Sequence, residues 1–471
     1  MTTQFELPAL LATQPLLLYE LNEVPWCVVD WYVARRPMSA LAQMLGGAHT
    51  FTTVTRDEGE LHPWTTWPSL HRGAYNTEHR IKFINQDLTV ANSFPPLWES
   101  AAAAGIKVGV FGSLQSYPLP VNVERDYLFY VPDTFAPRDE TFPASCVPFQ
   151  RFNLRQTRQD GAQAQDVQLD GSLASDVLGM LHGGLRFRTL GRLVAHLARE
   201  RINPLHRTRR SVMQAPVAFD FFHALISASQ PQFATFFTNH VAGMMHRYWR
   251  QSFPEDFPNA ASEPADAFHA KSIEFAMDVA DEQIARLMEY VATHKGLLVV
   301  ASSMGQEAID RGVYHGEWRI TDVEKFVRTA GWQHAYENVL AMQPDFNFVF
   351  DSDANARAFS EHMQRLTDCN GASIWKRAQV LANTVNMGLS PSVDALEDAR
   401  VFVMQPDGKN QPRALNELGI ECLQRDPGTG YHQPNGTLFF WGDVIKPKDA
   451  RNEIELSSVR GILAGALGIR R

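Results

Sequence analysis

Polar side chains able to do chemistry gather in four short segments, each at or just after a predicted strand. The segments are residues 20–23, 62–79, 238–249 and 431–436. They supply carboxylate, imidazole, amide and hydroxyl groups, which together can hold a divalent metal or an anionic ester. Because open α/β sheets gather their ligands at the carboxyl ends of the strands, we expect the four segments to form one crevice.

Taken singly, these residues also have ordinary structural explanations. His71, His79 and His246 lie near tryptophans in the sequence, where a histidine usually satisfies a hydrogen bond. Thr65 and Thr66 precede a Trp-Pro pair, which is typical of a turn or a helix cap. The coincidence of four polar strand ends is therefore more informative than any one residue.

The strands that must position these segments are short apolar runs. Such runs occupy residues 15–19, 106–111, 233–238, 297–301 and 437–441 and suit buried strands. Helical patterns occupy 98–105, 266–294 and 457–467, and the longest carries one apolar stripe. Strand and helix in alternation predict an α/β fold with a mainly parallel sheet flanked by helices.

Two regions interrupt this alternation within a single predicted domain spanning 1–471. Residues 140–215 are predicted to form an Arg-rich cap or lid, with eight arginines against the single acid Glu200 between 186 and 210. Arginine forks suit phosphate and sulfate, so Arg207, Arg209 and Arg210 are predicted to bind substrate; the alternative is a solvated surface. Residues 336–427 are predicted to form a small α/β insertion.

Composition narrows the classes of function. The chain has 471 residues with 43 basic and 52 acidic side chains, a net charge of −9, which argues against nucleic acid as a partner. Four separated cysteines exclude a cysteine zinc site and fit a reducing compartment. No apolar run reaches the ~18 residues of a membrane span, and the first residues lack a basic n-region. We therefore predict a cytoplasmic protein without a membrane span.

The order of the segments resembles the alkaline phosphatase superfamily, in particular its branch of type I phosphodiesterases, nucleotide pyrophosphatases and sulfatase-like proteins. The matching segments, in order from about residue 16 to 469, are LLLYELNE, TTWPSLHRGAYNTEHRI, AGIKVGVFG, FFTNHVAGMMHRYW, LLVVASSMGQ, YHQPNGTLFFWG and SSVRGILAGALGI. The resemblance implies an alkaline-phosphatase-like α/β fold. It also implies a phosphate or sulfate ester, of a small molecule or a glycan, as substrate.

The metal-binding positions depart from the pattern of that family. Asn239 and Gly243 stand where the resemblance implies Asp and His, and Ser303-Met304 stands where it implies Asp-His. A neutral serine and a thioether are poor ligands for hard divalent cations. We therefore expect no ordinary two-metal centre and at most one zinc, manganese or magnesium ion. Its predicted ligands are Glu20, Asn22, Asn239, His240 and His432.

The resemblance implies Thr66 or Thr65 as the nucleophile, and Ser69 is left as a further alternative. Glu20 and His240 are predicted as further catalytic residues. The leading prediction is a diverged hydrolase or transferase acting on a phosphate or sulfate ester. One alternative is a metal-free transferase for an activated sugar or polysaccharide intermediate, with His240, Glu20 and His432 as acid–base groups. The other is a catalytically inactive binding protein of the same fold.

Overall fold

The structure is a computed structural model that describes residues 5–160, 178–258, 266–310, 317–339, 341, 345–389, 399–404, 409–423 and 428–469. Parts of the predicted cap and of the predicted insertion lie outside these ranges. The chain forms two compact units, one of residues 1–82, 88–310 and 428–471 and one of residues 83–87 and 311–427. The long segment of the second unit begins at residue 311, whereas the predicted insertion begins at residue 336.

An eight-stranded sheet organises the first unit, with strand order β18-β2-β17-β6-β1-β5-β3-β4. All strand pairs are parallel except the two that β17 makes. The mainly parallel α/β sheet predicted from the sequence is therefore confirmed. The strands are β1 (Leu16–Leu21), β2 (His49–Val54), β3 (Val108–Phe111), β4 (Tyr127–Val131), β5 (Phe233–Thr238), β6 (Leu297–Ala301), β17 (Asn435–Trp441) and β18 (Lys448–Glu455).

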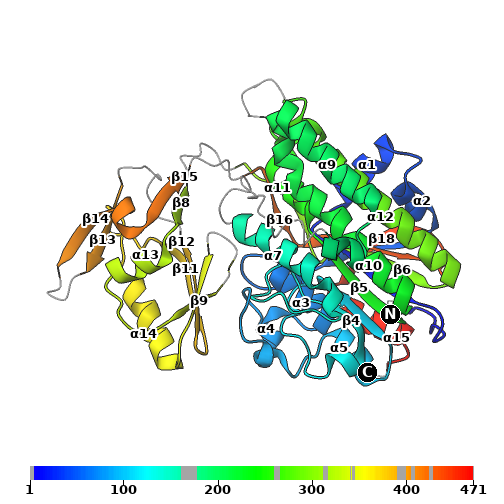
Figure 1. Ribbon diagram of the computed structural model, residues 1–471, viewed down its shortest axis with the longest axis horizontal. Helices are drawn as coiled ribbons and strands as arrows, with labels where there is room; N and C mark the ends of the chain where they lie inside the picture. The colour runs from blue at the N-terminus through cyan, green and yellow to red at the C-terminus, as the bar shows by residue number, and fades with distance from the viewer. Residues whose placement is uncertain are drawn as a thin grey trace. The chain divides into compact units, whose positions relative to one another are not determined.

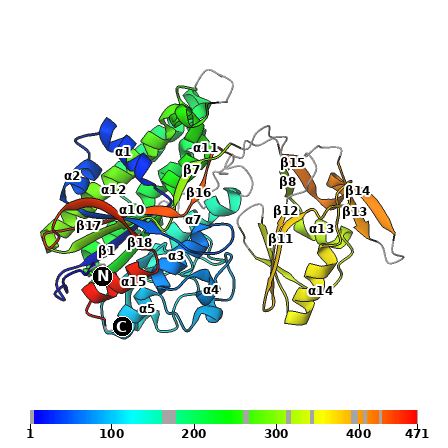
Figure 2. The ribbon, with the colours of Figure 1, turned by 180° about the vertical axis from the view of Figure 1, so that it is seen from behind.

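Helices cover both faces of this sheet (Figures 1 and 2). One face carries α1 (Trp26–Arg35), α2 (Ala40–Gly47), α9 (Phe187–Ile202), α10 (Gln214–Ser229), α11 (His240–Ser252) and α12 (Ser272–His294). The other carries α3 (Pro63–Arg72), α4 (Asn76–His79), α5 (Leu97–Ala103) and α15 (Ser458–Ala466). Further elements are α6 (Val123–Asp126), α7 (Val147–Asp160), the 3₁₀ segment η3 (Pro204–Met213) and a ribbon of β7 (Gly305–Ala308) with β16 (Gly430–Gln433).

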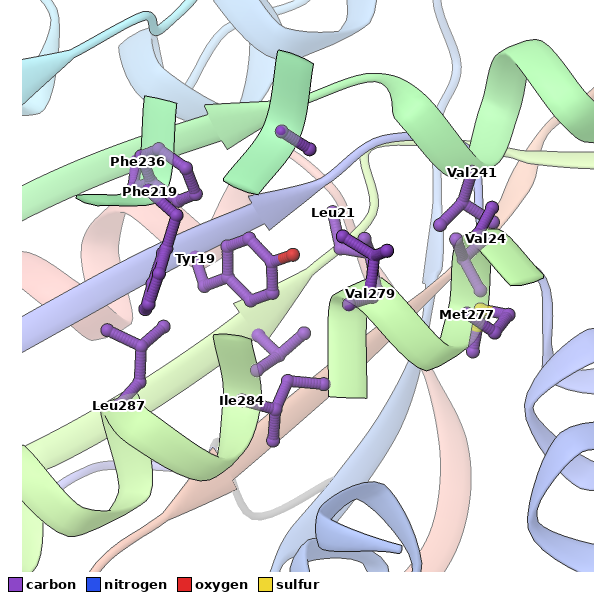
Figure 3. Packing of buried hydrophobic residues seen from close by; sticks show 14 of the residues in the cluster. Tyr19, Leu21, Val24, Phe219, Phe236, Val241, Met277, Val279, Ile284 and Leu287 are labelled. Carbon is purple, nitrogen blue, oxygen red and sulfur yellow. The ribbon is translucent and has the colours of Figure 1, made fainter. Parts of the chain in front are cut away.

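Side-chain alternation along β1 decides which face each residue serves. The strand LLLYEL is buried throughout, as the parallel-strand prediction requires. Tyr19 points toward α12, where its hydroxyl donates to Gln283, and it packs among Phe236 and Ile284 (Figure 3). Its neighbour Glu20 points to the opposite face, because successive strand residues alternate. That face carries α3, and His71 of this helix contacts Glu20.

The second unit has its own core. An antiparallel sheet of order β11-β12-β10-β9 packs against helix α14, whose Phe359 contacts Phe348 of β10. Its elements are β8 (Glu317–Ile320), α13 (Val323–Thr329), β9 (Glu337–Val339), β10 (Asp345–Val349), α14 (Asp353–Met363), β11 (Trp375–Leu381), β12 (Thr384–Leu389), β13 (Arg400–Met404), β14 (Asn410–Ala414) and β15 (Ile420–Leu423). Among the helices within the described ranges, none is long and apolar enough to cross a membrane.

Candidate metal centre

Three side chains in the first unit form a group of the type that binds a metal ion. Glu23 Oε2 lies 3.0 Å from His246 Nε2 and 3.4 Å from His432 Nε2. One ligand atom from each residue lies within 4.8 Å of the others, and no second group of three or more such residues occurs in the described part of the chain. Tetrahedral ligands about 2.0–2.1 Å from a zinc ion stand roughly 3.3 Å apart. The two measured separations match that spacing.

Three elements bring the group together. Glu23 follows β1, His246 lies on α11 and His432 lies on β16. Glu23 has φ of 63°, a left-handed backbone that costs a non-glycine residue free energy and often marks a functional site. The Glu23 and His432 side chains are 2% and 8% exposed, whereas that of His246 is 32% exposed. The group therefore opens to solvent beside His246.

The hydrogen bond of His246 fixes what its second nitrogen can do. His246 Nδ1 lies 2.9 Å from the carbonyl oxygen of Gly430, which only accepts, so Nδ1 carries the proton. In the neutral ring, Nε2 then presents a lone pair to the Glu23 carboxylate. Two lone pairs face each other stably only with a cation between them, either a proton or a metal ion. A metal-binding histidine typically has this outer hydrogen bond to a carbonyl.

The charges within the group shift the pKa values of Glu23 and His432. Burial raises the pKa of Glu23, but the adjacent His432 and His246 outweigh it and hold this pKa well below its usual value. Burial lowers the pKa of His432, but Glu23 more than offsets that effect and raises it. The carboxylate is thus ionised, which is the form that binds metal.

Amide side chains orient the carboxylate. Trp67 Nε1 donates to Asn22 Oδ1 at 2.7 Å, which turns Asn22 Nδ2 toward Glu23 Oε1 at 2.8 Å and Asn239 Oδ1 at 2.6 Å. Gln306 Nε2 donates to Glu23 Oε2. The carbonyl oxygen of Asn22 is therefore engaged by an indole, and this residue positions Glu23.

The structure brings together only part of the predicted ligand set. His432 lies in the group, and Asn22 and Asn239 adjoin it through the hydrogen bonds above. Glu20 lies on the other face of β1, where its Oε1 is 2.9 Å from His71 Nε2 and 3.1 Å from the Ser113 hydroxyl. His240 turns into the core, where Nδ1 contacts Thr238 Oγ1 at 2.7 Å and Nε2 the Ala276 carbonyl at 3.1 Å.

The predicted sequence set omits Glu23 and His246. A detectable signal existed for both: Glu23 belongs to the first polar segment, and His246 follows Asn239 by two helical turns. The resemblance directs attention to position 243, one turn earlier, where this chain has glycine. A histidine one turn further along lies on the same helix face. A motif that expects the histidine at one fixed position does not detect it there.

Thr66 lies in the second turn of α3, fully buried, with its hydroxyl 2.7 Å from that of Ser303. Thr65 is also buried, at 4% exposure. His62, which precedes this helix, packs edge-on to His432 with ring centroids 5.7 Å apart. The residue before α3, His62, therefore contacts the group of Glu23, His246 and His432 through the ring of His432.

The predicted substrate arginines have different environments. Arg209 is buried, donates to the Phe268 carbonyl and stacks on the Phe268 ring at 3.9 Å. Arg210 pairs with the buried Glu200 at 3.0 Å. Arg207 is exposed. Arg209 and Arg210 thus already serve the packing of η3, while their predicted role toward substrate remains a prediction.

Comparison with known proteins gives remote likenesses only. No family model and no curated protein matches the sequence. Among solved structures, the chain is similar to Thermus thermophilus alkaline phosphatase, with TM-score 0.44, 12% identity and coverage of 100% of this chain and 95% of that one. It is also similar to murine ectonucleotide pyrophosphatase/phosphodiesterase 5, with TM-score 0.41, 9% identity and coverage of 97% and 96%. Phosphonoacetate hydrolase from Sinorhizobium meliloti 1021 gives TM-score 0.41, 12% identity and 96% coverage of both chains.

Proposed function

We propose that the chain is a hydrolase or transferase for a phosphate or sulfate ester, with one divalent metal held by Glu23, His246 and His432. The observation that carries the proposal is the carboxylate flanked by two imidazole nitrogens at 3.0 and 3.4 Å. Two imidazoles and one carboxylate, with an open side at His246, suit a catalytic zinc or manganese site. A bound metal supplies Lewis acidity toward the ester oxygens and stabilises developing charge.

The chain's own groups have separable roles in this proposal. Asn22 and Gln306 hold the two oxygens of Glu23, so the carboxylate stays oriented as substrate enters. Thr66 is the proposed nucleophile, and Ser303 orients its hydroxyl. A threonine hydroxyl must lose its proton before it attacks. In the complex with substrate, a base or the metal ion must therefore lie close to the Thr66 hydroxyl.

A metal-free transferase remains the second candidate, and one observation favours it. Gln306 Nε2 donates to the same Glu23 oxygen that faces both histidines. A protonated His432 beside an ionised Glu23 would satisfy that oxygen without a metal. His432 and Glu23 would then form the acid–base pair of a transfer reaction.

Metal content decides between the two candidates. We expect the purified protein to bind about one zinc or manganese ion per chain and to lose it in Glu23→Gln and His246→Gln variants. The matched control is His240→Gln, which removes a histidine of the same helix that contacts the core. It should keep the metal. Elemental analysis and calorimetric titration measure both.

Hydrolysis of aryl phosphate monoesters, diesters and sulfates should fall together with metal content in the same variants. A metal-free protein whose transfer activity survives His246→Gln would support the second candidate. If the purified protein binds no metal and acts on no ester, only the alternative of a catalytically inactive binding protein remains.

A further inference from the structure

Helix α9 presents apolar side chains to solvent and polar side chains to the protein. Phe187, Val194 and Ile202 are 79%, 60% and 85% exposed. They recur at spacings of seven and eight residues, so they share one helix face. The inward face carries Thr189, His196 and Glu200, all buried. An ordinary surface helix turns its apolar stripe to the core, whereas α9 also exposes a separate apolar face to solvent.

The fold itself does not need the outward apolar face. The inward side holds α9 in place through Glu200, which pairs with Arg210 and with His196 at 3.3 Å. Leu190 and Leu193 pack partly buried against the main core. Phe187, Val194 and Ile202 add apolar surface without contributing comparable burial.

Cations flank the outward apolar stripe. Arg188 and Arg199 lie along one side of it and Arg201 along the other, by helical spacing, and all three are exposed. Within the described ranges, no carboxylate lies within ion-pair distance of these three guanidinium groups. The chain as a whole carries a net charge of −9, so the surface of α9 differs in sign from the molecule's average.

We propose that the outward face of α9 binds an anionic lipid surface, with the helix axis parallel to the membrane plane. Apolar side chains on one face of a helix, bordered by arginines, are the features of a helix that lies in the membrane interface. The arginines would contact anionic headgroups while Phe187, Val194 and Ile202 enter the acyl boundary. This inference does not depend on the proposed hydrolase activity.

Charge distinguishes this occupant from a second copy of the chain. A two-fold contact through α9 would bring the same arginines of both copies together, because such an interface pairs each patch with itself. Like charges at close range repel, whereas an anionic headgroup layer attracts them. The flanking arginines therefore favour lipid over self-association.

Flotation of the full-length protein with vesicles tests the proposal. We expect binding to vesicles of phosphatidylcholine with phosphatidylserine and much weaker binding to phosphatidylcholine alone. The triple variant Arg188→Gln/Arg199→Gln/Arg201→Gln should weaken binding on the order of 100-fold, since each cation near an anionic surface contributes about fivefold to the affinity. High salt should weaken binding of the parent protein in the same way.

The variant Phe187→Ser/Val194→Ser/Ile202→Ser should lose vesicle binding and keep its thermal unfolding midpoint, because these side chains are exposed. Two controls match these changes elsewhere: Arg328→Gln/Arg357→Gln/Arg365→Gln removes three exposed arginines, and Val121→Ser removes a fully exposed valine. Both should bind as the parent does. The proposal is overturned if the parent ignores anionic vesicles or if the serine variant binds equally well. It is also overturned if sedimentation shows a dimer of the parent that the serine variant dissociates.

Discussion

Asp57, Ser69 and His79 form a hydrogen-bonded set that resembles a nucleophile with its base, but its proton directions are opposite. The Ile81 backbone N–H donates to His79 Nδ1 at 2.9 Å, so the neutral ring carries its proton on Nε2 and donates it to Ser69 Oγ at 3.0 Å. Ser69 in turn donates to Asp57 at 2.7 Å. Burial, with a contribution from Arg72, lowers the pKa of His79 to about 3. This histidine cannot accept the serine proton, so the set is structural.

The hydroxyls of Thr66 and Ser69, both on α3, are therefore expected to have different roles. We expect Thr66→Ala to reduce ester hydrolysis on the order of 1000-fold or more, as loss of a nucleophile does. Both Thr66→Ala and Ser69→Ala should lower the free energy of unfolding by about 1–3 kcal/mol, because Ser303 loses a buried hydrogen bond in the first variant and Asp57 and His79 lose one in the second. Only Thr66→Ala should abolish ester hydrolysis. Steady-state kinetics and urea unfolding of both variants provide the check. Equal kinetic losses in the two variants would contradict the assignment.

His240 gives a residue-level prediction about pH. Burial lowers its pKa to about 4, against a usual value near 6.5. The unfolded chain therefore binds this proton first, so the stabilising contribution is complete above pH 6.5 and is lost as pH falls toward 4. The loss is on the order of 3 kcal/mol. Urea unfolding of the parent and of His240→Gln at pH 7 and at about pH 4.5 measures it, and the variant should lose less stability on acidification. A variant as acid-sensitive as the parent would contradict the prediction.

At the scale of elements, the alternation of side chains along a strand explains a limit of the sequence prediction. The sequence predicts where the site lies better than it predicts which residues form the site. The apolar runs predict β1, β5, β6 and β17 closely, and the polar strand ends do adjoin one another. Which face each side chain serves depends on alternation and on the turn after the strand. Glu20 faces α3, whereas Glu23 reaches His246 and His432 from a left-handed turn. Apolar patterning carries no information about that turn.

A close approach between neighbouring strands gives the prediction at this scale. Gly109 of β3 lies opposite Phe129 of β4, and a Cβ at Gly109 would be 2.1 Å from the Phe129 ring. The ring is fully buried, so it has no solvent to move into. Gly109→Ala should therefore lower the free energy of unfolding by about 3 kcal/mol, the upper end of ordinary overpacking.

Two further variants isolate the cause. In the Gly109→Ala background, Phe129→Leu should cost less than it does in the parent, which a double-mutant cycle by urea unfolding detects. Gly191→Ala on α9 is the matched control, since a Cβ there meets nothing within 4 Å. It should stabilise the helix by about 1 kcal/mol. Additive losses at positions 109 and 129 would show that the ring is not the obstacle.

At the scale of the whole molecule, the sequence indicates a secondary α/β segment but not its start. The DFNFVF run and the helix after it correspond to β10 and α14. The unit also includes residues 83–87, where the Ile84 carbonyl accepts from Asn347 Nδ2 at 2.6 Å. A contribution of five residues from so far away in the chain leaves no compositional trace, so local patterns cannot reveal it.

The two ends of the long segment 311–427 join the first unit at adjacent points. The Ile309 N–H donates to the Thr429 carbonyl at 2.9 Å, and Ala308 pairs with Gly430 in the β7–β16 ribbon. Asp310 and Gly428 therefore continue an antiparallel pair that a two-residue Asn-Gly turn can close. All three proposed metal ligands, Glu23, His246 and His432, belong to the first unit.

We therefore expect a chain with residues 311–427 replaced by Asn-Gly to fold and to bind the same metal. Phe83 and Ile84 are buried in the second unit, so both should be changed to serine to avoid an exposed apolar pair. The shortened chain should unfold in one cooperative transition and hold the same metal equivalent as the parent, whereas His246→Gln in this background should hold none. Circular dichroism melting and elemental analysis measure the two properties. Cooperative unfolding with loss of the metal would contradict the assignment of the centre to these three ligands of the first unit.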